Sequence, residues 1–287
     1  MRPAPWATFA TTLLALLAFA GNSLLCRLAL REEAIDPIAF TTLRIASGML
    51  VLSPFLPSSS TGRRLALGAE RAWLGAGALL AYALFFSLAY VTLDAGIGAL
   101  LLFGAVQGTM LGAGFLRGER MNARQLAGAL AAVAGLLVLL LPIRRDPETR
   151  DALFMLVAGV AWGVYSLHGR HVASARVATA RNFLLATPVV LVVFLASWSD
   201  VSLSWTGALL AALSGAVTSG LGYLVWYSAL RGHSATSAGL VQLAVPVLAA
   251  AGGVAILGET WTGRATLAAL LTLGGIALAV TARGRKT

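Results

Sequence analysis

Apolar runs of about 20 residues, separated by short loops, follow one another along the 287-residue chain. An α-helix needs roughly 20 apolar residues to cross a hydrocarbon core about 30 Å thick. Runs such as residues 126–141 do not alternate between apolar and polar side chains, which argues against the strands of a transmembrane barrel. With 59% hydrophobic residues, 11% charged residues and a mean hydropathy of +0.85, the chain is more apolar than a soluble domain. The sequence therefore predicts an all-α polytopic membrane protein.

Ten transmembrane helices fit between the turn signals of this sequence. The Pro- and Ser-rich loop 57–62, the charged stretch 144–151 and Gly232 are typical of breaks between helices. The helices are expected at residues 6–30, 37–56, 72–93, 95–116, 122–143, 152–168, 177–198, 204–230, 234–257 and 262–282.

The second part of the chain repeats the first at an offset of 140 residues. Gly258 ends a long apolar run as Gly118 does, and a glutamate follows each of them. A repeat of this length is far longer than the unit of a solenoid array. The chain is therefore interpreted as two five-helix repeats, residues 1–145 and 146–287. Further equivalent pairs are Leu100 and Leu240, Arg124 and Arg264, and Gly135 and Gly275.

Basic residues are distributed unevenly between alternate loops. Fourteen Lys and Arg residues fall on one side of the expected helices and five on the other. Cytoplasmic loops carry an excess of basic residues, so both termini are expected to face the cytoplasm, and the net charge of +10 needs no nucleic-acid partner. Because five helices per half is an odd number, the second repeat is expected to be inverted relative to the first. Inverted repeats commonly build transporters with a substrate site near the midplane.

Acidic residues are expected only in loops and at helix ends. The three histidines, His168, His171 and His233, fall near the cytoplasmic ends of helices. Proton-coupled transporters often use an acidic residue or a histidine inside the membrane. The sequence therefore favours facilitated transport that is not coupled to protons.

Two arginines fall inside expected helices, and Arg44 lies deeper than Arg27. Arg44 is interpreted either as the partner of a substrate carboxylate or as a structural residue that snorkels or bonds to helix-end carbonyls. Uncharged polar side chains in lipid need hydrogen-bond partners, so they either hold helices together or line a wet cavity. Such residues are Asn22, Gln107, Ser166 and Gln242.

The aromatic residues divide by expected depth. Those at helix ends are explained by anchoring at the membrane interface: Trp6, Trp73, Trp198, Trp205 and Trp261. Those inside helices are Tyr82, Phe85, Phe86, Phe103, Trp162, Tyr165, Tyr223, Trp226 and Tyr227. Each of the inner residues alone is typical of packing. As a group they could instead form the wall of a cavity that suits a small amphiphilic solute with an apolar or cationic portion.

Proline and glycine positions predict local helix geometry. Pro246 lies inside an expected helix and predicts a kink, whereas Val106 at the equivalent position of the first half does not. Glycines at four-residue spacing predict close helix contacts in the membrane. These stripes are Gly104, Gly108 and Gly112, and Gly159 and Gly163.

The sequence lacks the dinucleotide fingerprint, the phosphate-binding loop, H-E-x-x-H and C-x-x-C. Its single cysteine, Cys26, excludes an intrachain disulfide. No catalytic residue, metal or cofactor is therefore expected, and the chain is not interpreted as an enzyme.

The tandem five-helix pattern resembles the paired EamA domains of the drug/metabolite transporter superfamily. The residues that carry this resemblance are Ala20, Gly21, Asn22 and Ser23, Arg44 after Pro37, Gly118 with Glu119, Ala161, Trp162 and Gly163, Pro246, and Gly258 with Glu259. Overall impression and aromatic content make the chain look most like the YddG-type bacterial amino-acid exporters. The resemblance implies export of amino acids, aromatic and other neutral ones included, by alternating access in the bacterial inner (plasma) membrane. Alternative substrates are drugs or organic cations, or else nucleotide sugars and sugar phosphates.

The expected partners are an amino-acid substrate and the lipid bilayer; the sequence is compatible with a monomer and leaves the oligomeric state open. Aromatic side chains are expected to hold the apolar part of the substrate, and polar side chains its charged groups. The candidate substrate-binding residues are Asn22, Arg44, Tyr82, Phe86, Phe103, Gln107, Trp162, Tyr165, Ser166, Tyr223, Trp226 and Gln242.

Overall fold

The structure, a computed structural model, describes residues 5–31, 34–58, 72–91, 93, 95–116, 118, 121–140, 149–198, 202–257 and 263–281. Within these ranges the regular backbone is helical, apart from an isolated antiparallel bridge between Ile35 and Leu203. The prediction of an all-α protein is confirmed for this part of the chain.

The helices of the first half begin and end within a few residues of the predicted positions. They are α1 (Pro5–Arg31), α2 (Pro37–Leu52) with a short 3₁₀ turn (Ser53–Phe55), α4 (Ala72–Ala89), α5 (Ala95–Leu116) and α6 (Ala123–Leu140). The start of α2 follows from local chemistry, because Asp36 Oδ1 accepts hydrogen bonds from the backbone N–H groups of Ile38 and Ala39 at 2.8 and 3.0 Å. Pro37 at the first helical position lacks an N–H group that would otherwise need a partner.

The helices of the second half are more often interrupted. They are α7 (Thr149–Gly169), α8 (Ala175–Ala196), α9 (Trp205–Leu213), a π-helical segment (Ser214–Leu221), α10 (Gly222–Ala229) with a 3₁₀ turn (Leu230–Gly232), α11 (Ala235–Gln242), α12 (Ala244–Leu257) and α13 (Gly263–Thr281). Serine side chains cap α8, α9 and α11 at their first turns: Ser174, Ser204 and Ser234.

The break between α11 and α12 at Leu243 confirms the predicted effect of Pro246. Proline has no N–H group to donate to the carbonyl of Gln242, four residues earlier, and its ring crowds that carbonyl. In the first half, α5 runs without interruption through Val106.

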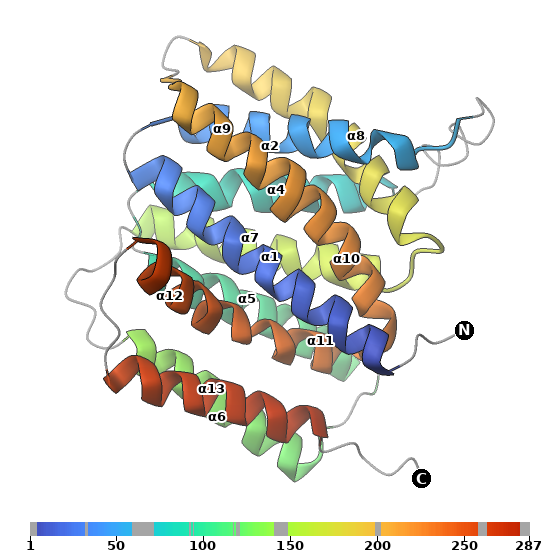
Figure 1. Cartoon of the computed structure of the whole chain (residues 1–287). Helices are drawn as coiled ribbons and strands as arrows, with labels where there is room; N and C mark the ends of the chain where they lie inside the picture. The colour runs from blue at the N-terminus through green and yellow to red at the C-terminus, as the bar shows by residue number, and fades with distance from the viewer. Residues whose placement is uncertain are drawn as a thin grey trace.

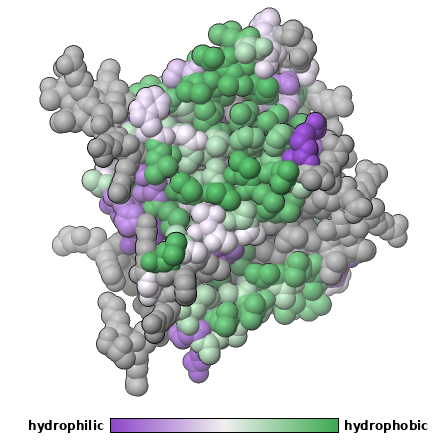
Figure 2. Space-filling model, turned by 180° about the vertical axis from the view of Figure 1, so that it is seen from behind, coloured by the Kyte–Doolittle hydropathy of each residue, from purple (hydrophilic) through white to green (hydrophobic). Residues whose placement is uncertain are grey.

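Seven helical stretches among the described residues are long and apolar enough to cross a membrane. They are Trp6–Leu30, Pro37–Phe55, Ala72–Ala89, Arg150–Gly169, Ala175–Ala196, Trp205–Gly232 and Ser237–Ile256, and α5 contributes a shorter apolar helix, Leu101–Gly114. A broad apolar area fills the middle of the face shown in Figure 2, with hydrophilic residues mostly toward its edges. The chain is therefore a polytopic membrane protein, and the total of ten crossings stays a prediction.

The tryptophans confirm the expected division by depth. Trp6, Trp73, Trp198 and Trp205 at helix ends are 58 to 85% exposed, whereas Trp162 and Trp226 are at most 3% exposed. Trp261 lies outside the described residues. Exposed tryptophans at helix ends are placed to meet the membrane interface.

The helix contacts follow the duplication (Figure 1). At the offset of 140 residues, α7 corresponds to α1, α4 to α10 and α5 to α12. The contact between α4 and α7 therefore has an equivalent in the contact between α10 and α1, and the contact between α5 and α7 has one in the contact between α12 and α1. The same correspondence relates the α4–α8 contact to the contact of the π segment with α2. The helices α6 and α13 pack on each other at one edge of the bundle. These contacts support two related halves, while the boundary at residue 145 and the inverted insertion stay predictions.

The glycine stripes gave one correct and one wrong prediction. A Cβ atom added at Gly159 would overlap the backbone of Leu102 on α5, and one at Gly163 would lie 2.7 Å from Thr109. These two glycines do allow α5 and α7 to approach closely. On α5, however, a Cβ atom at Gly104, Gly108 or Gly112 would meet nothing within 4 Å, so this stripe faces outward and packs on no described element.

Candidate functional site

All twelve candidate residues are buried, with at most 6% of any of them exposed. They come from α1, α2, α4, α5, α7, α10 and α11. Their contacts divide them into a guanidinium group with its hydroxyl partners, an aromatic cluster, and a pair of amide side chains beyond it.

Arg44 of α2 is fully buried and is bonded to side chains from α4, the π segment and α10. Its Nε donates to Ser219 Oγ at 2.8 Å, and its Nη2 donates to the hydroxyl groups of Tyr82 at 3.3 Å and of Tyr223. The guanidinium carbon lies 5.2 Å from the ring centroid of Tyr82 and 5.5 Å from that of Phe86. Aromatic faces at these distances stabilise a cation.

The positive charge of Arg44 has no acidic partner among the described residues. Its Nη1 is buried and makes no hydrogen bond there. Arg44 does not snorkel, because it is fully buried, and its structural partners are side-chain hydroxyl groups and not helix-end carbonyls. A buried cation without a counter-charge is costly in a low-dielectric medium, and the hydroxyl groups and ring faces around Arg44 offset part of that cost.

Asn22 of α1 extends the polar region toward the π segment. Its Oδ1 accepts hydrogen bonds from Ser214 Oγ at 2.6 Å and from Thr218 and Ser219 at 3.4 Å. Ser219 therefore contacts both Asn22 and Arg44. A polar strip thus joins α1, α2 and the π segment inside the helix bundle.

Next to Arg44 lies a cluster of five rings, which we call the aromatic cage: Phe19, Tyr82, Trp162, Tyr223 and Trp226. The ring centroid of Trp162 lies 5.0 Å from Phe19, 4.8 Å from Tyr82 and 4.7 Å from Tyr223. Phe19 packs edge-on against Trp226 at 5.5 Å. Such tilted and edge-to-face arrangements are the favoured geometries of aromatic pairs.

Two glutamine side chains, Gln107 of α5 and Gln242 of α11, also belong to the candidate site. Trp162 Nε1 donates to Gln242 Oε1 at 2.6 Å, and Gln242 Nε2 donates to the Ala238 carbonyl at 3.0 Å and to Met110 Sδ at 3.3 Å. Gln107 of α5 is 6% exposed, and neither atom of its amide has a hydrogen-bond partner among the described residues. Because an amide without partners is costly in this medium, Gln107 is available to a polar group of a ligand.

The remaining candidates have mostly structural contacts. Ser166 Oγ accepts from Trp226 Nε1 at 3.0 Å, which satisfies both groups. Tyr165 stacks on Trp162 at 5.4 Å, and its backbone carbonyl accepts from the Tyr227 hydroxyl at 3.0 Å. Phe103 of α5 is 5% exposed, and within the described residues it makes no ring contact with the cage.

The π segment packs directly against α2 beside Arg44. A Cβ atom added at Gly215 would overlap the Arg44 carbonyl oxygen and the Ser47 hydroxyl, and one at Gly48 would lie 3.0 Å from the Gly215 carbonyl. Glycines therefore allow the backbones of α2 and the π segment to touch. Short π-helical segments are rare and occur frequently at functional sites.

Comparison with known proteins places this fold and site in a family. The family model described as the EamA-like transporter family matches residues 6–141 and, a second time, residues 150–281. The chain belongs to the EamA-like transporter family. The expected resemblance to paired EamA domains is therefore confirmed.

Relatives of this transporter are found in bacteria. It is 51% identical over 276 residues to the uncharacterized protein PA1977 of Pseudomonas aeruginosa, which covers 96% of this chain and 95% of that one. It is 26% identical over 210 residues to a Salmonella typhimurium protein named a probable amino-acid metabolite efflux pump, covering 68% of this chain and 70% of that one. A protein of known crystal structure with 24% identity has the same fold, with a TM-score of 0.73 over 93% of this chain and 98% of that one.

Several residues of this transporter's candidate site were not predicted from the sequence. Phe19 lies at the centre of the aromatic cage, and Ser214 and Ser219 of the π segment bind Asn22 and Arg44. Serine and phenylalanine are ordinary residues in apolar helices, so their identity alone gave no signal. Arg181, a further buried basic residue, lies inside α8 and is 8% exposed.

Proposed function

We propose that this protein exports amino acids, aromatic and other neutral ones, by alternating access across the bacterial inner membrane. The observation that carries this proposal is the buried guanidinium of Arg44, which has no acidic partner among the described residues and lies beside the aromatic cage. A substrate carboxylate would supply the missing counter-charge and can pair with two N–H groups of an arginine at once. The cage would then pack on the apolar side chain of the same substrate.

The amide groups beyond the cage support recognition of a zwitterion. Gln107 Oε1 is a buried acceptor without a donor among the described residues, and an ammonium group carries three donors. Asn22 and Gln242 are already bonded within the protein, so we assign them to holding the π segment and the cage in place.

The direction and energy source are part of the same proposal. Export is supported by the Salmonella typhimurium relative, whose name is that of an efflux pump. Facilitated transport is supported by the positions of Asp36, which caps the start of α2, and of Asp151, which lies in the first turn of α7. The start of α1 and the end of α13 lie on the same side of the bundle in Figure 1, in keeping with both termini being cytoplasmic.

Export of organic cations is the second candidate, and the aromatic cage favours it because aromatic faces attract cations. Arg44 opposes it, since its own positive charge lies over Tyr82 and Phe86. For sugar phosphates, a dianion needs several buried basic groups, and α1 and α2 offer Arg44 and the half-buried Arg27.

The proposal is tested by transport into proteoliposomes that contain the purified protein. Uptake of labelled phenylalanine, tryptophan, leucine and alanine is measured with and without a pH gradient, and a quaternary ammonium compound is added as a competitor. We expect saturable amino-acid transport that does not depend on the gradient. Absence of saturable transport for every amino acid contradicts the substrate class, and strict dependence on the gradient contradicts facilitated transport.

A further inference from the structure

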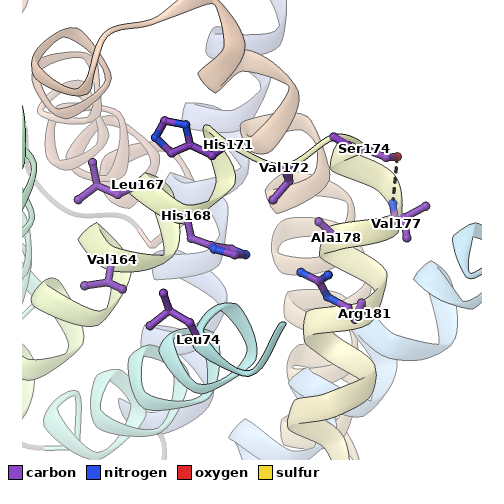
Figure 3. A pocket seen from close by; sticks show the side chains of 11 residues that line it. Leu74, Val164, Leu167, His168, His171, Val172, Ser174, Val177, Ala178 and Arg181 are labelled. Carbon is purple, nitrogen blue, oxygen red and sulfur yellow. Dashed lines mark hydrogen bonds between the residues drawn. The ribbon is translucent and has the colours of Figure 1, made fainter. Parts of the chain in front are cut away.

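A pocket of about 630 Å³ opens between α7, α8 and the start of α4. None of the twelve candidate residues lines it, so it is separate from the region around Arg44. Figure 3 shows the His168 ring of α7 and the Arg181 guanidinium of α8 directed toward each other across the space between the two helices.

Among the described residues that line this pocket, the ionisable ones all carry or can carry a positive charge. They are Arg181, which is 8% exposed, the half-buried His168 and the exposed His171. None of the eleven described residues that line the pocket is acidic. The first turn of α8, capped by Ser174, also borders the pocket, and a helix N-terminus adds a partial positive charge. The electrostatic environment therefore favours an anion.

The pocket also has a substantial apolar surface. Leu74, Val164 and Val177 line it from α4, α7 and α8. A site that combines basic groups with apolar walls suits a molecule with an acidic group attached to an apolar part. A free inorganic anion would leave this apolar surface uncovered.

The loop that closes the pocket is fixed by a contact from another helix. Arg231, in the 3₁₀ turn after α10, donates through Nη2 to the Ala173 carbonyl at 2.6 Å. Ser174 Oγ accepts from the Val177 N–H at 3.4 Å, which holds the start of α8. The lining is thus ordered before a ligand binds, which reduces the entropy cost of binding.

The inner wall of the pocket continues to the aromatic cage. Arg181 lies close enough to Tyr165 and Tyr227 to interact with them electrostatically, and Tyr165 stacks on Trp162. A ligand held near Arg181 would therefore be separated from the cage by one layer of aromatic side chains.

We propose that this pocket is a second binding site, which takes the acidic group of an anionic amphiphile. Arg181 and His168 bind the acidic group, and the apolar residues of α4, α7 and α8 contact the remainder. The acidic group is the carboxylate of a dissolved molecule or the phosphate of an anionic lipid, because both present anionic oxygens beside an apolar chain. This site exists whether or not amino acids are exported through the cage.

The test uses the full-length protein, with ¹⁵N-labelled histidine, in phosphatidylcholine nanodiscs. The chain has three histidines, so ring signals of His168 and His171 report on the pocket and His233 serves as an internal control. Titration with phenylacetate is expected to shift the signals of His168 and His171 saturably, and phenylacetamide, which is neutral, is expected to leave them unchanged. R181Q is expected to weaken phenylacetate binding by about tenfold or more, since a hydrogen bond to a charged group is lost.

A matched pair of variants at Ser174 keeps the test valid even if R181Q folds poorly. Asp and Asn both cap a helix as well as Ser does, so S174D and S174N should preserve the start of α8. S174D adds a negative charge to the pocket and is expected to weaken binding severalfold, whereas S174N is expected to bind as the natural protein does. Equal affinities in the two variants contradict the proposal.

Nanodiscs containing phosphatidylglycerol distinguish the two sources of the acidic group. If this lipid shifts the two histidine signals and blocks phenylacetate, the site takes a lipid phosphate. If phenylacetate shifts them in both lipids, the site takes a dissolved carboxylate. No histidine shift with either ligand, or a shift abolished by R44L and retained in R181Q, overturns the proposal.

Discussion

The two halves of this transporter share a helix arrangement but differ in the regularity of their inner helices. In the first half, α4 and α5 run without interruption. Their counterparts in the second half contain the π segment Ser214–Leu221 and the break at Leu243. Both irregularities lie beside the candidate site, since the π segment binds Arg44 and Asn22 and the break follows Gln242. Among the described residues, the second half therefore concentrates the distorted backbone, and it does so beside the candidate site.

The halves also differ in chemistry at equivalent positions. The residues 140 positions from the polar candidates are Leu184 for Arg44, Trp162 for Asn22, Val247 for Gln107 and Leu102 for Gln242. No polar candidate of one half is repeated in the other. Instead, Arg44 and Asn22 of the first half bind hydroxyl groups of the second, such as Ser219. The duplication produces the shared helix arrangement. Divergence between the two copies produces a candidate site in which Arg44 is the charged residue.

The largest effect is expected from R44L, which places the residue of the second half at the equivalent position of the first. Loss of a buried charged partner costs roughly 2–5 kcal/mol, so amino-acid transport should fall by about 30-fold or more. The measurement is initial uptake into proteoliposomes, with L184A as a control expected to transport normally. Transport by R44L at the natural rate would show that the charged end does not contact the substrate.

The second test exchanges Val106 of the continuous helix α5 with Pro246 of the interrupted pair α11 and α12. V106P should interrupt α5 and lower the free energy of unfolding by about 3 kcal/mol, because proline removes a hydrogen bond and crowds the preceding turn. P246V should join α11 to α12, return a donor to the Gln242 carbonyl and raise stability by about 1 kcal/mol. Thermal unfolding of both variants in detergent measures whether stability falls in V106P and rises in P246V. If the break serves as a hinge, transport by P246V should be slower than that of the natural protein. A destabilised P246V would mean that the rest of the fold requires the break.

A third test uses the equivalent glycines Gly215 and Gly75. In G215A the new methyl group would overlap the backbone of α2 at Arg44, and overpacking of this kind costs about 1–3 kcal/mol. In G75A the nearest atoms belong to the Asn182 side chain, at 2.7 to 3.0 Å, and this amide can rotate away. The melting temperature should therefore fall more in G215A than in G75A. Equal decreases would show that the close contact is not specific to the π segment.

The smallest effect is expected at the turn before α11. His233 Nε2 lies 2.9 Å from Thr12 Oγ1 of α1, and Nδ1 lies 3.2 Å from Ser237 Oγ, whereas the first half has the buried Leu93 at the equivalent position. Burial, with a smaller contribution from Arg170, lowers the pKa of His233 below its usual value.

A lowered pKa means that the folded state disfavours the protonated histidine. Stability should therefore be constant above about pH 6.5, the ordinary histidine pKa, and should decrease as the pH falls below it. H233Q should remove this decrease and H171Q, at an exposed position, should retain it. Melting temperatures of the natural protein and both variants, measured above and below pH 6.5, test this prediction. If the stability of the natural protein does not change below pH 6.5, the contribution of His233 is contradicted.

The sequence did not predict which polar residues far apart in the chain bond to each other. Arg44 was predicted to lie deep in a helix and to seek an anion or a structural partner, but its partners Ser219 and Tyr223 lie 175 and 179 positions away. Which face of a transmembrane helix meets which neighbour depends on its rotation, and an apolar helix surrounded by lipid carries little polar pattern to indicate it. The outward-facing glycines of α5 were misassigned for the same reason.

The sequence by itself determined the helical class, the helix positions, the duplication, the depth of the tryptophans and the break caused by Pro246. These properties follow from composition, local turn chemistry and backbone sterics, which act over a few residues. Only the tertiary structure decided that Phe19 enters the aromatic cage, that the π segment touches α2, and that Arg181 faces His168 across a second pocket. Those features depend on how helices from both halves pack together, and packing is decided by shape and hydrogen-bond complementarity between residues far apart in the chain.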